Sequence, residues 1–447
     1  MRLSSVIKNT MVALLTGTVC LGGSLPAEAA GITGLTVSSV SKPVSLSPLL
    51  RWDRYADAVC FELELFDERP GQLNKNGKSP VAIWCNEYVF NNACNVPLYR
   101  IVGENFSGYL WWRVRPLNFD HEPIGEFSSP AEIFVSDREA RMNAPEPMGD
   151  DAPKLLYPVY SWVGQHDAEK YRVEIYSGNP AKSGGAILLG TLDADLSEKY
   201  DDVPRQDSPD VYWRVHAYDK DGEPLGQWSA PKKLKRLKGR QHIAVYGDSI
   251  SHGGGRMSYG PDIPEYSYLT YLNFRAGNLA CSGRTTADMV ENFRSDVLPF
   301  RPRYLLILGG SNDLRAEWGD PKESINNIRQ LSELCVDSGI RPIFLTLPPI
   351  NPQQIAKAFG DKSADDWRAK FDALNEYIRR TLPHIDSAAP FEKLSKGRGM
   401  PAELAVDGLH GDVKAKQMMA ESINKNWAAA KKSADRWYKE KIKERKS

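Results

Sequence analysis

The feature that most constrains the fold is an apolar run that ends abruptly at a polar turn. Residues 243–246 read Ile-Ala-Val-Tyr, and the next three residues are Gly247, Asp248 and Ser249. A short apolar run bounded by turn residues is typical of a buried strand. Open α/β sheets bind their ligands at the carboxyl ends of parallel strands. The pattern therefore predicts a buried parallel strand that presents a serine hydroxyl at the edge of the sheet.

Three further polar motifs follow that serine in chain order. One contains Gly283, one contains Asn312 shortly after the apolar run 304–308, and the last is Asp407-Gly-Leu-His410. A serine hydroxyl is a weak nucleophile until a base takes its proton, and a histidine oriented by an aspartate is such a base. Backbone N–H groups and an asparagine amide can bind a tetrahedral oxyanion. The catalytic candidates are Ser249, Asp407 and His410, and the candidate oxyanion donors are Ser249, Gly283 and Asn312.

Each motif also has an ordinary structural interpretation. Asp407 can cap the turn into a last helix while His410 lies on the surface, and Asn312 can be a simple turn residue. The order of the motifs along the chain favours a catalytic site over a set of unrelated turns. Two other histidines are weaker candidates, because His252 stands on the serine's own turn and His384 has no aspartate three residues before it.

The first residues have the pattern of a secretory signal. Arg2 and Lys8 form a basic start, an apolar stretch follows, and Ala27-Glu28-Ala29 is a small-x-small cleavage site. We therefore expect residues 1–29 to be removed and the protein to be exported, either to the periplasm or by secretion. We expect no transmembrane segment in the mature chain, because no later apolar run is long enough. The zero net charge gives no indication of nucleic-acid binding.

The chain before residue 240 repeats itself with a period of about a hundred residues. The stretch 48–52 resembles 158–162, and 112–115 resembles 213–216. Both copies alternate apolar and polar residues, as strands with one buried face do. The pattern resembles fibronectin type III-like modules and predicts two all-β sandwich modules, over residues 30–140 and 153–237. Large aromatic residues at repeated positions favour a core over a glycan-stacking surface; these residues are Trp52, Trp112, Trp162 and Trp213.

The ordered motifs after residue 240 resemble those of the SGNH hydrolases, also called GDSL esterases/lipases. The block I serine, the block II glycine, the block III asparagine and the block V Asp-x-x-His correspond here to Ser249, Gly283, Asn312, Asp407 and His410. The resemblance covers roughly residues 242–428. One position departs from the pattern, since many members have an earlier block II glycine where this chain has Ala280.

The resemblance implies an α/β three-layer, flavodoxin-like domain with a parallel sheet. It also implies an esterase that hydrolyses O-acyl esters through a Ser-His-Asp triad and an acyl-enzyme. Export and the added modules favour O-acetyl esters of carbohydrate as substrates, with other small esters as the alternative. An O-acyltransferase acting on a polysaccharide and a non-catalytic glycan-binding or scaffold protein also stay open, as does the oligomeric state. We expect no cofactor, and the histidines and cysteines show no metal-ligand spacing.

Beyond residue 240 the pattern changes to alternating apolar strands and amphipathic helices. Strands are expected at 242–246, 304–308 and 342–346. Helices are expected at about 285–298, 322–338, 364–381 and 412–430. We assign the α/β domain to 240–430 and a charged tail, expected as an exposed helix, to 431–447. Because every candidate lies beyond Arg240, we expect the chain from there onward to carry the chemistry without the modules.

The cysteines and one basic run leave two interpretations each. An exported protein permits disulfides, and Cys85 and Cys94 are close enough in sequence to bridge. Cys281 adjoins the glycine loop, and a small buried side chain is favoured there over a catalytic thiol. The basic run 232–240 is either a patch for anionic glycans or lipid headgroups, or a solvated strand and linker. We favour the linker, since charge runs at linkers are common.

Overall fold

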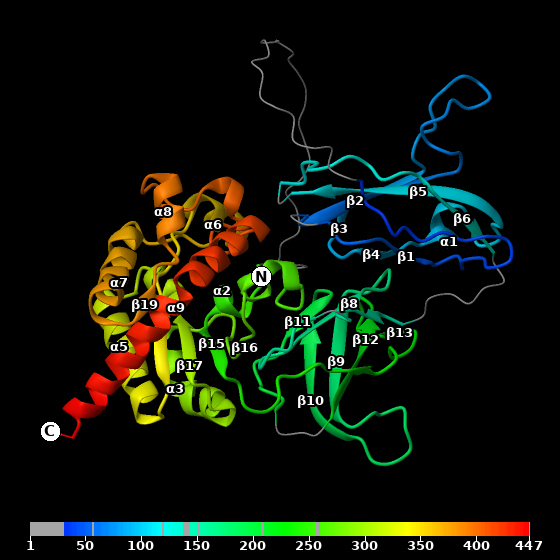
Figure 1. Cartoon of the computed structure of the whole chain (residues 1–447). Coiled ribbons are helices and arrows are strands. Elements are labelled where there is room, and N and C mark those ends of the chain that lie inside the picture. The colour runs from blue at the N-terminus through cyan, green and yellow to red at the C-terminus, as the bar shows by residue number, and fades with distance from the viewer. Residues whose placement is uncertain are drawn as a thin grey trace, which may run out of the picture. The chain divides into compact units, whose positions relative to one another are not determined.

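The computed structural model describes residues 31–55, 58–118, 120–136, 144–150, 152–206, 210–255 and 260–446. Residues Gly31–Ser447 form one compact unit (Figure 1). The expected signal, residues 1–29, lies outside the described residues. No helix in the described ranges combines the length and the apolar character that crossing a membrane requires.

The first β region, β1 to β6, is antiparallel. A four-stranded sheet has the order β3-β2-β5-β6, and β1 pairs with β4. Along β5 the buried residues alternate with more exposed ones, as a strand with one buried face requires. The elements are β1 (Leu49–Arg51), β2 (Cys60–Phe66), β3 (Trp84–Val89), β4 (Ala93–Asn95), α1 (Leu98–Ile101), β5 (Gly108–Leu117) and β6 (Ala131–Val135).

The second β region, β7 to β14, is antiparallel as well. One sheet has the order β10-β9-β12-β13 with β14 also on β12, and the other has the order β11-β8-β7. The strands are β7 (Glu146–Pro147), β8 (Val159–Val163), β9 (Lys170–Ser177), β10 (Ile187–Ala194), β11 (Glu198–Tyr200), β12 (Val211–Tyr218), β13 (Pro224–Leu225) and β14 (Lys232–Lys233).

The sequence repeat corresponds to repeated contacts in the two β regions. The backbone N–H of Val114 donates to Ser128 Oγ at 3.1 Å, and that of Val215 donates to Ser229 Oγ at 3.0 Å. The four repeated tryptophans are all buried, which confirms that they belong to the cores. Two lysines of the basic run form ion pairs, Lys232 with Asp150 and Lys233 with Asp210, each at 2.8 Å, which favours the linker interpretation.

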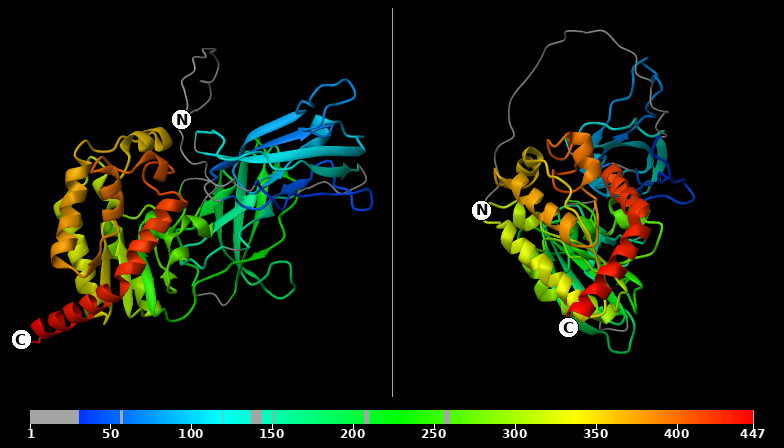
Figure 2. Two further views of the ribbon diagram at one scale, coloured as in Figure 1. Left: turned by 45° about the horizontal axis from the view of Figure 1, so that its top comes forward. Right: turned by 60° about the vertical axis from the view of Figure 1, so that its left-hand side comes forward.

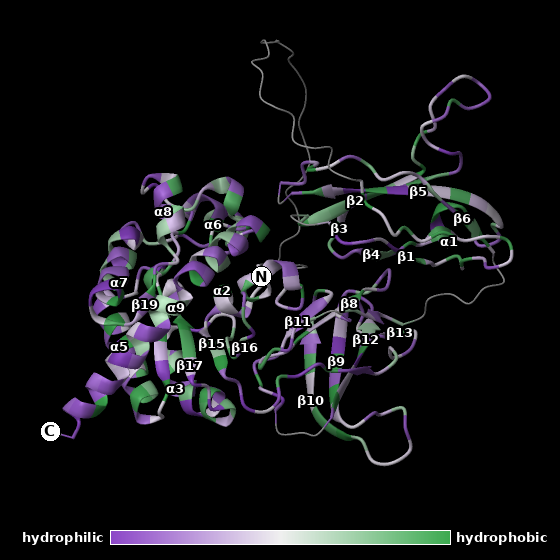
Figure 3. Cartoon of the chain, in the orientation of Figure 1, coloured by the Kyte–Doolittle hydropathy of each residue, from purple (hydrophilic) through white to green (hydrophobic). Residues whose placement is uncertain are grey.

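The α/β region contains a five-stranded parallel sheet with the order β16-β15-β17-β18-β19. The parallel sheet predicted from the apolar runs is confirmed, and its strand β17 is coloured as hydrophobic in Figure 3. The strands are β15 (Ile243–Gly247), β16 (Gly277–Asn278), β17 (Tyr304–Leu308), β18 (Arg341–Leu345) and β19 (His384–Ile385).

Helices α3, α5 and α7 pack in series, and α9 packs against β18 and β19 (Figure 2). The α-helices are α2 (Ser249–His252), α3 (Thr286–Val297), α4 (Ser311–Leu314), α5 (Pro321–Asp337), α6 (Pro352–Phe359), α7 (Trp367–Thr381), α8 (Ala389–Ser395) and α9 (Val413–Glu444). Short 3-10 turns are η1 (Pro264–Tyr266), η2 (Tyr268–Tyr271), η3 (Leu298–Phe300) and η4 (Ala402–Leu404).

Two features of the α/β region differ from the expected layout. Helix α9 runs unbroken to Glu444, so the charged tail is the end of this helix and not a separate one. Tyr438 holds it to the body, because the Arg341 guanidinium lies 4.1 Å from the centre of the tyrosine ring. At the other end of the region, Leu156 and Tyr157 pack into the hydrophobic core around the sheet, although they precede β8.

The cysteines do not form the bridge that their spacing allowed. Cys85 lies exposed on β3, Cys94 lies buried on β4, and both thiols are free. These strands belong to different sheets, so nearness in the sequence does not bring the two sulfur atoms together. Burial raises the pKa of the Cys94 thiol to about 12, which makes it an unreactive core residue.

Candidate active site

Ser249 stands where the sheet ends, at the first residue of α2. The preceding strand β15 pairs with β17 up to Gly247 opposite Leu308. A Cβ atom at Gly247 would lie 2.1 Å from the Leu308 carbonyl oxygen, so only glycine fits this close approach of the two strands. Asp248 caps the helix, since its Oδ1 accepts the backbone N–H of Ile250 at 3.0 Å. The turn is thus fixed on both sides of the serine.

The structure brings Ser249, His410 and Asp407 into one hydrogen-bonded chain. His410 Nε2 lies 2.7 Å from Ser249 Oγ, and His410 Nδ1 lies 2.8 Å from Asp407 Oδ2. Asp407 is fully buried and His410 is 6% exposed. A carboxylate partner at Nδ1 places the ring proton there, which leaves Nε2 free to accept the serine proton. This is the arrangement of a serine nucleophile and its base.

Asp407 is held in its charged form by the residues that follow it. Its Oδ1 accepts the backbone N–H groups of Leu409 at 3.0 Å and of His410 at 2.8 Å. Burial acts to raise the pKa of Asp407, but His410 and these hydrogen bonds outweigh it and lower the pKa below its usual value. The three-residue spacing of the motif therefore lets one carboxylate both shape its turn and orient the imidazole.

Two of the three expected oxyanion donors, Gly283 and Asn312, lie on the loop before α3 and on α4. Gly283 has φ +84°, a left-handed conformation that favours glycine, and no other atom lies within 4 Å of the point where a Cβ would stand. Asn312, on α4, donates one N–H of its amide to the carbonyl of Arg284 at 3.0 Å. A primary amide has two N–H donors, so Asn312 has a second N–H next to the loop that carries Gly283.

A second contact joins these two loops behind the site. Asp313 Oδ1 accepts the Thr286 hydroxyl at 2.6 Å and the Thr286 backbone N–H at 3.0 Å. Asn312 and Asp313, which follow β17, therefore form hydrogen bonds with Arg284 and Thr286 at the beginning of α3. The sequence gives no signal for this role of Asp313, because an aspartate beside an asparagine is typical of a turn.

His252 does not contact the serine and instead supports the glycine loop from behind. Its Nδ1 accepts the backbone N–H of Ser282 at 3.2 Å and lies 2.9 Å from the Ser282 hydroxyl. Its Nε2 lies 2.9 Å from the carbonyl oxygen of Tyr157. Burial lowers the pKa of His252 to about 4, so the ring is neutral and donates from Nε2.

Arg284 makes a second connection from the same loop to Tyr157. Its guanidinium contacts the buried Asp296 carboxylate and the Tyr157 hydroxyl, which in turn donates to Asp296 at 2.8 Å. The guanidinium also lies 4.7 Å from the centre of the Tyr157 ring. The segment before β8 is thus part of the support of the active-site loop. This argues against the expectation that the chain from Arg240 onward is sufficient.

Lys416 is a fully buried lysine under the serine helix. Its Nζ lies 3.4 Å from the carbonyl oxygen of Ile250, and the nearby acids are Asp407, Asp248 and Asp412. Burial lowers the pKa of Lys416 to about 8, although those acids act to raise it. The sequence pattern does not single out this residue, because a lysine in an amphipathic helix is ordinarily solvated.

Ala280 and Cys281, which lead into the glycine loop, have structural roles. Ala280 is buried where many family members have glycine. Cys281 donates its backbone N–H to the carbonyl of Gly247 at 3.0 Å, which joins the loop to β15. Burial raises the pKa of the Cys281 thiol to about 11, so the thiolate needed for catalysis is not formed near neutral pH.

A separate cluster in the first β region has metal-binding residue types. Within the described ranges, ligand atoms of Glu62, Cys85 and Glu87 all lie within 4.8 Å of one another. Glu62 already pairs with Arg115, and burial together with neighbouring acids raises the pKa of the Cys85 thiol to about 12. The cluster is remote in the sequence from the serine motif and forms no part of the triad.

Comparison with known proteins adds evidence about the family. Residues 245–417 match the profile of the GDSL-like Lipase/Acylhydrolase family. The uncharacterised lipoprotein YqeF of Bacillus subtilis (strain 168) is 25% identical over 197 residues, which are 38% of this chain and 81% of YqeF.

Solved structures with similarity to this chain include a GDSL-like lipase and an acetylxylan esterase. A GDSL-like lipase from Bacteroides thetaiotaomicron is 21% identical, with 42% of this chain and 87% of that chain covered and a TM-score of 0.34. The acetylxylan esterase Axe2 from Geobacillus stearothermophilus is 20% identical, with coverages of 42% and 94% and a TM-score of 0.33. Residues 245–417, which include the serine, glycine, asparagine, aspartate and histidine of the ordered motifs, are therefore similar to the GDSL-like lipase/acylhydrolase family.

Proposed function

We propose that the protein is an exported serine esterase that hydrolyses O-acyl esters, O-acetyl esters of carbohydrate above all. The observation that carries the proposal is the chain of short contacts from Asp407 through His410 to Ser249, at 2.8 and 2.7 Å. A non-catalytic binding protein has no need of a buried, charged aspartate behind a histidine that faces a serine. The family supports ester hydrolysis as the reaction.

In the first half of the proposed reaction, His410 Nε2 takes the proton from Ser249 Oγ as that oxygen attacks the ester carbonyl carbon. The carbonyl oxygen becomes an oxyanion, which the Ser249 and Gly283 backbone N–H groups and the Asn312 amide stabilise. The bond to the alcohol oxygen then breaks, and the proton on Nε2 passes to the leaving alcohol. The products are a free hydroxyl and an acyl group on Ser249. Asp407 stabilises the imidazolium between these steps.

In the second half, water takes the place of the alcohol. His410 accepts a proton from the water as its oxygen attacks the acyl carbon, and the same donors stabilise the second oxyanion. Collapse of this intermediate returns the proton to Ser249 Oγ and releases the carboxylic acid. If a sugar hydroxyl replaces water here, the product is a new ester and the enzyme is an acyltransferase. The triad serves both outcomes, so water access to the acyl-enzyme decides between them.

Export and a carbohydrate substrate rest on features outside the triad. The first 29 residues have the composition of a secretory signal. The relative YqeF is a lipoprotein, which supports a location outside the cytoplasm. Two β regions precede the α/β region, and such appended regions suit a polymeric substrate that must be held while one ester is cleaved.

Isotope labelling separates hydrolysis from transfer. The enzyme is incubated with an acetylated oligosaccharide in H2(18)O, and the released acetate and the sugars are analysed by mass spectrometry. Hydrolysis places one labelled oxygen in each acetate. Unlabelled acetate, or acetyl groups that move between sugars without release, would contradict the proposed hydrolysis.

A further inference from the structure

Trp318 is an exposed tryptophan on the loop that follows the asparagine motif. The loop runs from Arg315 to Asp320, between α4 and α5, and the tryptophan is 68% exposed. Among the described residues, its indole makes no hydrogen bond and no contact with another aromatic ring. Large aromatic side chains dominate cores and interfaces, so an indole left open beside a candidate active site indicates an interface with a ligand.

The loop is fixed against the residue next to Asn312. A Cβ atom at Gly319 would lie 1.9 Å from the carbonyl oxygen of Asp313, so only glycine permits this close approach. The Gly319 backbone N–H also donates to the carbonyl of Ala316 at 3.2 Å, which closes the turn that carries Trp318. Because consecutive Cα atoms are about 3.8 Å apart, these contacts keep the Cα atoms of Trp318 and Asn312 within about 13 Å of each other.

A buried lysine holds the same loop in place. Lys370, on α7, is 7% exposed, and its Nζ donates to the carbonyls of Ala316 at 3.1 Å and of Glu317 at 3.2 Å. The carbonyl of Arg315 accepts the backbone N–H of Ala364 at 2.8 Å. The three residues before the tryptophan are therefore all held by their backbone carbonyls. A surface that is rigid before a ligand arrives loses less conformational entropy on binding.

The surroundings of the indole are polar and carry both signs of charge. Lys362 Nζ lies 3.8 Å from Glu317 Oε1, and Arg315 Nη1 lies 3.8 Å from Asp361 Oδ2. Charged groups of this kind donate hydrogen bonds to hydroxyls or accept them, whereas the flat face of an indole packs against apolar surface. A sugar ring has both kinds of surface, because its hydroxyls surround a ring whose faces carry C–H groups.

The same surface does not suit a lipid or a membrane. In the described part of the α/β region, the large apolar side chains that are exposed are those of Trp318 and Leu394, and Leu394 lies on α8. Membrane and protein interfaces need a continuous apolar patch to which several such residues contribute. One open indole among charged neighbours instead matches the stacking of a single sugar ring.

We propose that Trp318 is a stacking platform for a sugar ring of the substrate, next to the oxyanion donor Asn312. The platform holds the carbohydrate beside the motif, so that an acyl group on the stacked sugar or on its neighbour is presented to Ser249. This deepens the proposed function and rests on it for the ester chemistry, whereas stacking of the sugar on the indole requires no catalysis.

Steady-state kinetics of the full-length protein test the platform, on whichever of acetylated xylohexaose, cellohexaose and mannohexaose the wild type cleaves best. Trp318→Ala should raise KM roughly tenfold, the upper end of what one aromatic contact contributes, with little change in kcat. Trp318→Phe keeps a flat ring and should recover most of this loss. On ethyl acetate, which has no ring to stack, the loss of kcat/KM in Trp318→Ala should be far smaller than on the sugar ester.

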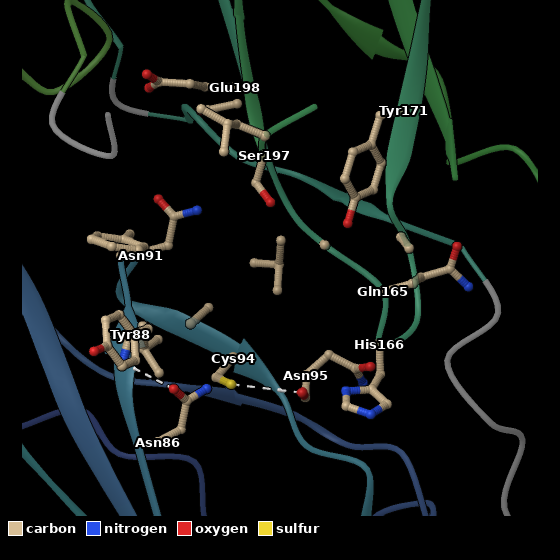
Figure 4. Close-up of a pocket in the computed structure, with 18 of the residues that line it drawn as sticks. Asn86, Tyr88, Asn91, Cys94, Asn95, Gln165, His166, Tyr171, Ser197 and Glu198 are labelled. Carbon is tan, nitrogen blue, oxygen red and sulfur yellow. Dashed lines mark hydrogen bonds between the residues drawn. The ribbon is translucent and has the colours of Figure 1, made fainter. Parts of the chain in front are cut away.

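Tyr88→Ala is the matched control for the loss of an exposed aromatic side chain. Tyr88 is 62% exposed and lies on β3, where it lines a polar cavity of about 340 Å³ between the two β regions (Figure 4). This variant should keep the KM of the wild type, and thermal unfolding shows that each variant is folded. Equal KM in wild type and Trp318→Ala, a similar rise in Tyr88→Ala, or an equal loss on ethyl acetate would each overturn the platform.

Binding without turnover separates this result from a failure of the proposed function. In full-length protein that carries Ser249→Ala, calorimetry measures the affinity for the same oligosaccharides, with and without Trp318→Ala. If the wild type cleaves no ester although Trp318→Ala weakens binding, the proposed esterase activity fails and the platform stands. If the wild type cleaves sugar esters but binding does not depend on Trp318, the platform fails and the proposed function stands.

Discussion

His252 Nε2 donates to the carbonyl of Tyr157 at 2.9 Å, while its Nδ1 accepts the backbone N–H of Ser282. One neutral imidazole thus connects the segment before β8 with the loop that carries Gly283. Tyr157 also meets the side chain of Arg284 on that loop. The conformation of the glycine loop therefore depends on residues that lie more than a hundred positions earlier in the chain.

Truncation tests this dependence. A chain that begins at Arg240 lacks Leu156, Tyr157 and Leu237, which are all part of the α/β core. Loss of each large apolar side chain from a core costs roughly 2–5 kcal/mol. We expect this chain to aggregate or to unfold at a much lower temperature than the full-length protein does. A chain that begins at Lys154 keeps all three residues. Thermal unfolding and cleavage of 4-nitrophenyl acetate give the readout. A soluble Arg240 chain with full activity would contradict the role of the segment.

Replacement of His252 tests the support of the glycine loop directly. We expect His252→Ala to lower kcat by about tenfold or more with little change in KM, because the loss falls on transition-state stabilisation. His252→Gln retains an acceptor and an N–H donor and should restore part of the rate. Steady-state kinetics on a small ester measure both variants. Equal activity of the alanine variant and the wild type would remove His252 from this role.

Asn312 is expected to act as an oxyanion donor. Asn312→Ala should reduce kcat by about a hundredfold or more, the usual loss for one such donor, without unfolding the protein. Asn326→Ala is a matched control, since Asn326 lies exposed on α5 away from the motifs. The rates are compared with thermal unfolding of each variant. A folded Asn312→Ala variant with near-normal kcat would place the oxyanion elsewhere.

Lys416 predicts a pH dependence of stability with a definite sign. Its folded pKa of about 8 lies below the ordinary value of 10.5, so the unfolded chain binds the proton more tightly. Unfolding takes up a proton between these two values, and the free energy of unfolding should rise with pH across this window. The shift corresponds to a rise on the order of 3 kcal/mol.

The variant Lys416→Met isolates this contribution from those of other groups. Urea unfolding at several pH values from 7 to 11 should show a smaller rise for the variant than for the wild type, because methionine has no proton to bind. The same rise in both proteins would show that Lys416 has an ordinary pKa and contributes nothing to the dependence.

Local patterns were enough to predict the part of the fold that carries the candidate site. Apolar runs that end in glycine located β15 and β17, and the parallel sheet follows from strands that alternate with helices. The geometry of Ser249, Asp407 and His410 agrees with the roles expected from their motifs. These residues are recognisable because each lies at the end of a strand or in a short, ordered motif.

The supporting contacts were not predictable in the same way. Tyr157 and Arg284 are 127 positions apart, and neither has a local pattern that indicates the other. Lys416 has the spacing of a surface residue, and only the packing of α9 buries it. The Cys85–Cys94 spacing suggested a bridge that the separate sheets prevent. Each of these features depends on packing between residues that are far apart in the chain, and local sequence patterns do not indicate such packing.

The proposal that Ser249 is the nucleophile is tested most directly by covalent labelling. The full-length protein is treated with a fluorophosphonate probe, and the modified peptide is identified by mass spectrometry. We expect the wild type to be labelled at Ser249, Ser249→Ala to stay unlabelled, and His410→Ala to react far more slowly because the serine loses its base. Labelling of Ser249→Ala to the same extent as the wild type, or of a different residue in the wild type, would contradict the account.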